Sequence, residues 1–213
     1  MQQPTTPISP TPQVSASPDA VKQPVREVHR IVFVGKPGTG KTTVIRRLVR
    51  RALENHRRVL VVTPHENEWE DLPMVHPRFI ERIATYKGAR RIIVRDVKEL
   101  YPVLDLFRHG LLVFDDCRVY VPDRQDEKIR AMLISTRQDD IDLCAVGHGF
   151  TTVPPIMFTY ATHFCVFATT DQVARRKGMV MNFDRLKAAV DEVNQKAASD
   201  PRCKHFYKIV PNV

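Results

Sequence analysis

The sequence contains no apolar run of the roughly 18 to 20 residues that a membrane-spanning helix needs, and its N-terminus lacks the apolar segment of a secretory signal. We therefore expect no integral membrane segment and no classical secretion. Cysteine is also scarce. The four cysteines are too far apart for a zinc knuckle or a redox pair, and they are typical of reduced thiols in a cytoplasmic compartment: Cys117, Cys144, Cys165 and Cys203.

Aromatic residues make up only 8% of the chain and are not interleaved with its basic clusters, which argues against stacking on single-stranded bases. Acidic residues are in the minority, since 33 Lys and Arg stand against 24 Asp and Glu, a formal net charge of +9. A domain this basic favours polyanionic partners, with nucleic acid ahead of an anionic membrane surface. Solubility alone would also account for the charge.

The N-terminal 25 residues differ in composition from the rest of the chain. Residues 1–25 contain six prolines among Ser, Thr and Gln, which predicts a disordered, Pro-rich tail that acts either as a flexible leader or as a docking segment. Residues 26–213 have the length of one ordinary domain, and the 43% hydrophobic content of the chain is enough for a core.

Strand and helix patterns alternate from residue 28 onward. Short apolar, β-branched runs predict strands at 28–34, 59–62, 92–94, 111–114, 143–146 and 164–167. Helical patterns follow residue 42 and cover 97–107, 124–137 and 184–198. This order predicts an α/β fold, a mainly parallel sheet flanked by helices on both faces.

A Gly-rich turn between the first strand and the first helix matches the phosphate-binding G-x-x-x-x-G-K-[ST] loop (Walker A) in full. Its glycines allow backbone N–H groups to point at phosphate oxygens, and the following helix N-terminus adds partial positive charge. We expect Lys41 to contact the β- and γ-phosphates of ATP and Thr42 to ligate Mg²⁺. The nucleotide-binding residues expected on this loop are Gly35, Lys36, Pro37, Gly38, Thr39, Gly40, Lys41, Thr42 and Thr43.

Two adjacent carboxylates, Asp115 and Asp116, end the buried strand at 111–114, as in a Walker B motif. Burying two acids side by side is costly without a cation. We expect Asp115 to hold Mg²⁺ through its water shell and Asp116 to act as the base that orients the attacking water. The alternative is that Asp116 only caps the next loop.

His148 follows the predicted strand at 143–146, and Arg137 precedes it. Ligands of open α/β sheets collect at the carboxyl ends of the strands, so His148 is a candidate sensor of the γ-phosphate. His148 is alternatively an ordinary surface or core histidine.

Basic residues cluster at four places. Arg46, Arg47, Arg50 and Arg51 lie opposite the apolar stripe of the first helix, and the pairs 46/50 and 47/51 repeat at i+4, which predicts one exposed basic surface. The other clusters are Arg57-Arg58, Arg90-Arg91 and Arg175-Arg176-Lys177. They are expected to face DNA phosphates, a neighbouring subunit or only solvent.

The order of these motifs resembles the FtsK/HerA superfamily of P-loop ATPases, and is most similar to its small DNA-packaging and DNA-translocating members from viruses and mobile elements. The residues that carry the resemblance are G-K-P-G-T-G-K-T-T (35–43), L-L-V-F-D-D (111–116), S-T-R-Q-D-D-I-D-L-C-A-V-G-H (135–148) and the segment 151–171. The resemblance spans Val28–Asp171 and implies a RecA/ASCE-like fold.

The resemblance also implies a homo-oligomeric ring, commonly a hexamer, that threads double-stranded DNA and docks on a capsid or membrane portal, so that the protein would be cytoplasmic or virion-associated. It implies that Arg137 acts as an arginine finger in a neighbouring subunit. The family more often has Glu at the position of Asp116 and Gln at that of His148, and these departures imply a slower enzyme or a different water geometry.

Three other functions remain open at this point. One is a phage-assembly ATPase of the zonula-occludens-toxin type, which usually carries a membrane segment. Another is a small-molecule or nucleotide kinase, for which Arg175–Lys177 would be the basic lid. The last is a nucleotide-gated binding module with little turnover.

Overall fold

The computed structural model describes residues 26–124 and 126–212. The expected Pro-rich tail, residues 1–25, lies outside the described residues. Across the described residues, no helix combines the length and the apolar character needed to cross a membrane.

A seven-stranded sheet forms the centre of the fold, in the spatial order β3-β2-β4-β5-β1-β6-β7. All neighbouring strands run parallel except β7, which is antiparallel to β6. The strands are β1 (Arg30–Val34), β2 (Arg58–Thr63), β3 (Ala89–Ile93), β4 (Gly110–Phe114), β5 (Ile141–Gly147), β6 (His163–Phe167) and β7 (Tyr207–Pro211).

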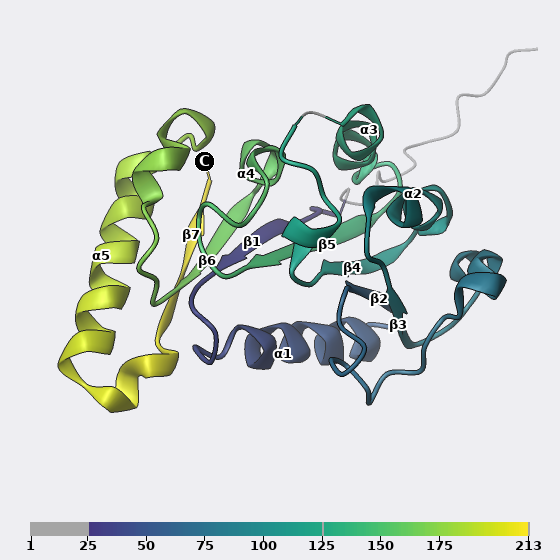
Figure 1. Ribbon diagram of the computed structural model, residues 1–213, viewed down its shortest axis with the longest axis horizontal. Helices are drawn as coiled ribbons and strands as arrows, with labels where there is room; N and C mark the ends of the chain where they lie inside the picture. The colour runs from purple at the N-terminus through teal and green to yellow at the C-terminus, as the bar shows by residue number, and fades with distance from the viewer. Residues whose placement is uncertain (1–25, 125, 213) are drawn as a thin grey trace, which may run out of the picture.

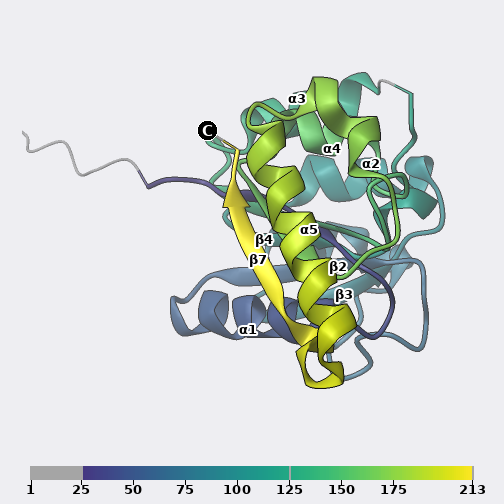
Figure 2. The same cartoon turned by 90° about the vertical axis from the view of Figure 1, so that its left-hand side faces the viewer.

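Helices cover both faces of the sheet (Figure 1). One face carries α1, and the other carries α2, α3 and α4, with α5 beside them over β6 and β7 (Figure 2). The α-helices are α1 (Lys41–Glu54), α2 (Val97–Leu106), α3 (Glu127–Ser135), α4 (Pro155–Tyr160) and α5 (Phe183–Ser199). Short 3₁₀ segments are η1 (Pro77–Ala84), η2 (Cys117–Val119), η3 (Val173–Met179) and η4 (Pro201–His205).

The side chains on the two faces of each central strand belong to two separate hydrophobic clusters. Val32 and Val34 of β1 belong to the cluster under α2–α5, whereas Phe33 points to the other face and packs with Ile45 and Val49 of α1. Because successive side chains of a strand alternate between faces, a strand with helices on both sides must be apolar at every position. The buried β4 run, apolar throughout, is explained in this way.

The predicted α/β fold with a mostly parallel sheet is confirmed, and its predicted strands and helices are present with ends that shift by a few residues. Two elements were not expected. The short helix α4 begins at Pro155, the second of two consecutive prolines, and β7 returns antiparallel along β6 after the turn at η4. α4 is too short to show a helical period, and β7 mixes polar and apolar residues with a proline and so lacks the apolar run of the buried strands.

Candidate functional site

The loop between β1 and α1 is held close to the end of β6. The Lys36 N–H donates to the carbonyl of Ala168 at 2.9 Å. A Cβ added to Gly35 would lie 2.4 Å from Cβ of Phe167, so only glycine fits at this close approach. Gly38 and Gly40 adopt left-handed φ angles of 74° and 93°, which the tight turn requires.

Lys41 is folded back onto this loop. Its ammonium donates to the carbonyls of Gly35 at 2.6 Å and Lys36 at 2.9 Å. The side chain is 6% exposed, and burial lowers the pKa of Lys41 to about 8 even though the charges of Asp115 and Asp116 oppose this shift. No side chain caps the first turn of α1, so its N–H groups remain available to an anion.

The acidic pair follows β4, where the sheet ends beside the loop. Asp115 is 7% exposed and accepts a hydrogen bond from the indole Nε1 of Trp69 at 2.6 Å. Asp116 has a left-handed φ of 46°, a conformation that Asp tolerates better than most residues, and its Oδ2 lies 3.2 Å from Nε2 of His65. The two neighbouring carboxylates therefore have different surroundings, one buried beneath an indole and the other facing an imidazole.

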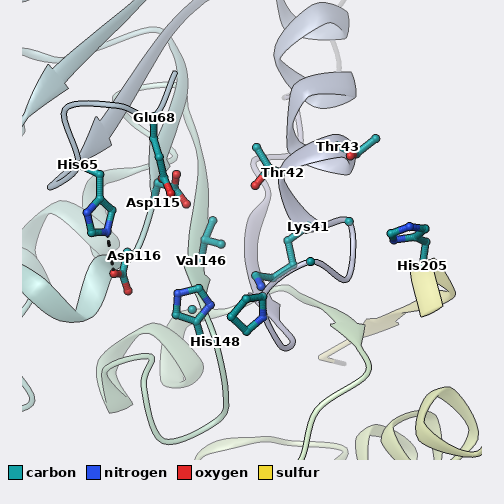
Figure 3. Close-up of a pocket in the computed structure, with 14 residues that line it drawn as sticks. Lys41, Thr42, Thr43, His65, Glu68, Asp115, Asp116, Val146, His148 and His205 are labelled. Atoms are coloured by element: carbon teal, nitrogen blue, oxygen red, sulfur yellow. Dashed lines mark hydrogen bonds and ion pairs between the residues drawn. The ribbon is translucent and has the colours of Figure 1, made fainter. Parts of the chain in front are cut away.

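A third carboxylate, Glu68, lies beside the pair (Figure 3). Partial burial, followed by a hydrogen bond to Asp115 and the negative charge of that residue, raises the pKa of Glu68. Glu68 and Trp69 come from the loop after β2, and Arg91 of β3 holds this loop by donating to the carbonyl of Glu68 at 2.7 Å. Neither Glu68 nor Trp69 was predicted from the sequence. The available signal was that a loop leaving the carboxyl end of a parallel strand opens onto the same edge of the sheet.

These segments line one cavity of about 350 Å³ at the carboxyl ends of the strands (Figure 3). Since β5 lies between β1 and β4, His148 projects between the phosphate-binding loop and the acidic pair. The lining residues are Pro37, Gly38, Gly40, Lys41, Thr42, Thr43, His65, Glu68, Asp115, Asp116, Val146, Gly147, His148 and His205. Most of the predicted site residues thus meet in one place.

Gly35, Lys36 and Thr39 belong to the same loop but do not line the cavity. Arg137 is not brought to it either, because this exposed residue lies in the turn before β5, at the opposite edge of the sheet. Any contact between Arg137 and such a cavity would have to be with the cavity of another subunit.

Several residues of the basic clusters form ion pairs or hydrogen bonds within the protein. Arg57 forms an ion pair with Asp140 at 3.0 Å, and Arg58 donates to three backbone carbonyls. Arg176 is buried and donates to the carbonyls of Phe150 at 2.7 Å and Val153 at 2.9 Å, which does not fit a mobile basic lid.

On α1, Arg46 pairs with Asp71 at 2.6 Å and stacks on Trp69 with its Cζ 4.5 Å from the ring centroid. Arg47, Arg50 and Arg51 are exposed and form no ion pair with the described residues. The predicted basic surface of α1 is therefore confirmed for these three residues, whereas the guanidinium of Arg46 is paired with Asp71 and stacked on Trp69.

The side chains at the acidic end of the cavity fit a hard cation bound together with phosphates. The Thr42 hydroxyl and the carboxylates of Asp115 and Glu68 face the same space (Figure 3). Among the described residues there is no group of three or more His, Cys, Asp or Glu side chains that could hold a metal ion by themselves. Mg²⁺ commonly takes one or two carboxylates and completes its shell with substrate phosphates and water.

Comparison with solved structures finds the same fold in viral packaging NTPases and in VirB4. The genome packaging NTPase B204 from Sulfolobus turreted icosahedral virus 2, in complex with AMPPCP, superposes with a TM-score of 0.64 at 14% identity, over 87% of this chain and 98% of B204. The DNA-packaging ATPase B204 from Sulfolobus Turreted Icosahedral Virus gives 0.61 at 15% identity, over 86% of this chain and 97% of that one. VirB4 of Thermoanaerobacter pseudethanolicus gives 0.53 at 10% identity, over 77% and 83%.

A comparison with curated proteins gave no match. The profile of one protein family, described as Poxvirus A32 protein, matches residues 21–203, which include the phosphate-binding loop, the acidic pair and His148. Because this match covers most of the sequence, the chain belongs to the Poxvirus A32 protein family.

Proposed function

We propose that this protein is a Mg²⁺-dependent ATPase of the FtsK/HerA type that drives viral genome packaging. The observation that carries the proposal is the cavity in which Lys41, Thr42 and the glycines Gly38 and Gly40 of the phosphate-binding loop face the Asp115–Asp116 pair. Family membership and the fold shared with the genome packaging NTPase B204 support it.

Each residue of the cavity has a role in this proposal. Lys41 leaves the carbonyls of Gly35 and Lys36 to contact the β- and γ-phosphates, and Thr42 and Asp115 hold Mg²⁺. The bound ion would neutralise charge on the phosphates. Asp116, held by His65, orients the attacking water, and His148 contacts the γ-phosphate.

We further propose a homo-oligomeric ring, with a hexamer as the expected size, in which Arg137 of one subunit reaches the cavity of the next. An arginine finger typically contributes about 10³–10⁵ in rate, so the isolated subunit should be a poor ATPase. The exposed position of Arg137, away from its own cavity, supports a role in a neighbouring subunit.

Double-stranded DNA is the proposed partner, held by its backbone phosphates. Arg47, Arg50 and Arg51 form the basic surface left free on α1 for this purpose. Replacing Arg50 and Arg51 by Gln should lower the salt dependence of DNA binding, by about one unit of log–log slope for each DNA phosphate that is no longer neutralised. An unchanged slope would place the DNA elsewhere on the protein.

Phosphate release measured with and without double-stranded DNA tests the function. We expect DNA to stimulate release several-fold and Lys41→Ala to abolish it. Phosphate transfer only to an added small acceptor would indicate a kinase. Tight ATP binding without turnover in either condition would indicate a binding module.

Mixed subunits test the shared site. Arg137→Ala and Asp116→Ala chains should each be inactive alone and partly active when mixed, because a mixed interface restores one intact site. Gln138→Ala, at the exposed neighbour of Arg137, is the matched control and should retain activity. Absence of any rescue would contradict the role in trans.

A further inference from the structure

The cavity has two chemically different ends, with Lys41 between them (Figure 3). Glu68, Asp115 and Asp116 lie at one end and Thr42 lies near the middle beside Lys41, whereas His205 lies at the other end, on the side of Thr43. A terminal phosphate directed at the acidic end leaves the α-phosphate and the nucleoside toward the opposite end. The nucleoside must therefore leave the loop on the side of His205.

His205 lies directly on the phosphate-binding loop. Its Nδ1 is 3.2 Å from the point where a Cβ on Gly40 would stand, and the side chain is exposed and lines the cavity. Among the described residues, it is the one cavity-lining side chain contributed by the chain after residue 148. An exposed imidazole at this place is available to stack on a planar ring that binds beside the loop.

The segment that carries His205 is fixed by packing. We call η4 and β7, residues 201–211, the C-terminal hook. Tyr207 of the hook stacks on Phe167 with ring centroids 5.1 Å apart, and Lys196 of α5 lies 4.0 Å from the ring centroid of Phe206. Asp200 accepts a hydrogen bond from the N–H of Arg202 at 2.8 Å, which caps η4. These contacts fix the chain just before and just after His205 and so hold His205 in place.

We propose that His205 is the stacking face for the nucleobase of the bound nucleotide. This inference rests on the proposed function of the cavity and assigns a role to the C-terminal hook. Stacking on an aromatic side chain tolerates different bases because every base has a π face. His205 is therefore expected to contribute to the affinity for ATP and GTP alike rather than to discriminate between them.

The test compares ATP with inorganic tripolyphosphate, which has the phosphates but no base. Mg²⁺ is present throughout, and binding is measured by calorimetry on the full chain. His205→Ala should weaken ATP binding about tenfold and leave tripolyphosphate binding unchanged, since base–aromatic stacking typically has an effect of this order. His205→Phe should keep the affinity for ATP, because its ring also stacks.

Lys204→Ala is the matched control, because Lys204 is exposed on the same turn but does not line the cavity. This variant should bind both ligands normally. The inference is wrong if His205→Ala binds ATP normally, or if it weakens ATP and tripolyphosphate equally. If the unaltered protein binds neither ligand, the proposed nucleotide function itself is wrong, a result distinct from the failure of the His205 assignment.

Discussion

Trp69→Phe removes the indole N–H that donates to Asp115 while keeping an aromatic ring beneath Arg46. The donor and the acceptor residues are both nearly inaccessible to water, at 3% and 7% exposure, so water cannot replace the missing partner. Asp115 would be left as a buried carboxylate with one hydrogen bond fewer. We therefore expect a less stable protein with weaker binding of Mg²⁺–ATP.

The expected loss of folding free energy has two parts, the lost hydrogen bond to Asp115 and the cavity left by the smaller ring. A hydrogen bond to a charged group contributes about 1.5–3 kcal/mol, and at 2.6 Å the contact between Trp69 and Asp115 is short enough for a strong one. The smaller ring adds about 1 kcal/mol for the cavity it leaves. The free energy of unfolding should fall by about 3 kcal/mol.

Urea denaturation followed by circular dichroism measures this change. Fluorescence is not suitable, because the sequence has a single tryptophan. A double-mutant cycle with Asp115→Asn separates the hydrogen bond from the packing, and the coupling should be about 1.5 kcal/mol because the acceptor loses its charge. Equal costs of Trp69→Phe in the two backgrounds would refute this explanation.

Three further predictions concern stability and the surroundings of the site. Gly35→Ala should lower the free energy of unfolding by about 1–3 kcal/mol and abolish ATP binding, because its Cβ would overlap Phe167. Gly178→Ala is the control, since nothing lies within 4 Å of the new Cβ, and denaturation and binding assays should show no change in its stability or in its affinity for ATP. Burial alone would raise the pKa of Asp171, but hydrogen bonds from Thr151 and Gln172 and the charge of Arg175 together outweigh it, so that the pKa is lowered. This contribution to stability is present above the unfolded-state pKa of about 4 and is lost as the pH falls through the lower folded-state pKa. Thr151→Val should therefore cost about 1 kcal/mol at neutral pH and less at about pH 2, and an equal cost at both would contradict a role for the Asp171 charge. A thiol reagent should label Cys203 in the native protein and the three buried cysteines only after unfolding. Rapid labelling of more than one thiol in the native protein would show that the core around the buried cysteines opens.

The sequence carried enough local information to predict the fold class and most of the residues that line the cavity. The phosphate-binding loop is contiguous, and its glycines are required by the turn itself, as the left-handed φ of Gly38 and Gly40 illustrates. The run at 111–116 is likewise contiguous, an apolar strand that ends in two acids. Alternating strand and helix patterns led to the parallel sheet because each pattern depends only on neighbouring residues.

Basic clusters illustrate what local patterns leave undecided. Arg57, Arg58 and Arg176 look like surface charges in the sequence, yet the fold surrounds them with carbonyls and carboxylates. The hydrogen-bond partners of Arg57 and Arg58 lie between 25 and 83 residues away along the chain. No local composition distinguishes such an arginine from one that remains free, as Arg50 does on α1.

Tertiary structure alone decided the order of the strands and therefore which distant side chains meet. The insertion of β5 between β1 and β4 brings His148 between the loop and the acidic pair, and the loop after β2 brings Glu68 and Trp69 to Asp115. The return of β7 along β6 sets His205 on the loop at Gly40. These placements come from the packing of two sheet faces and from crossovers between distant strands, whereas the residues of the phosphate-binding loop are neighbours in the chain before it folds.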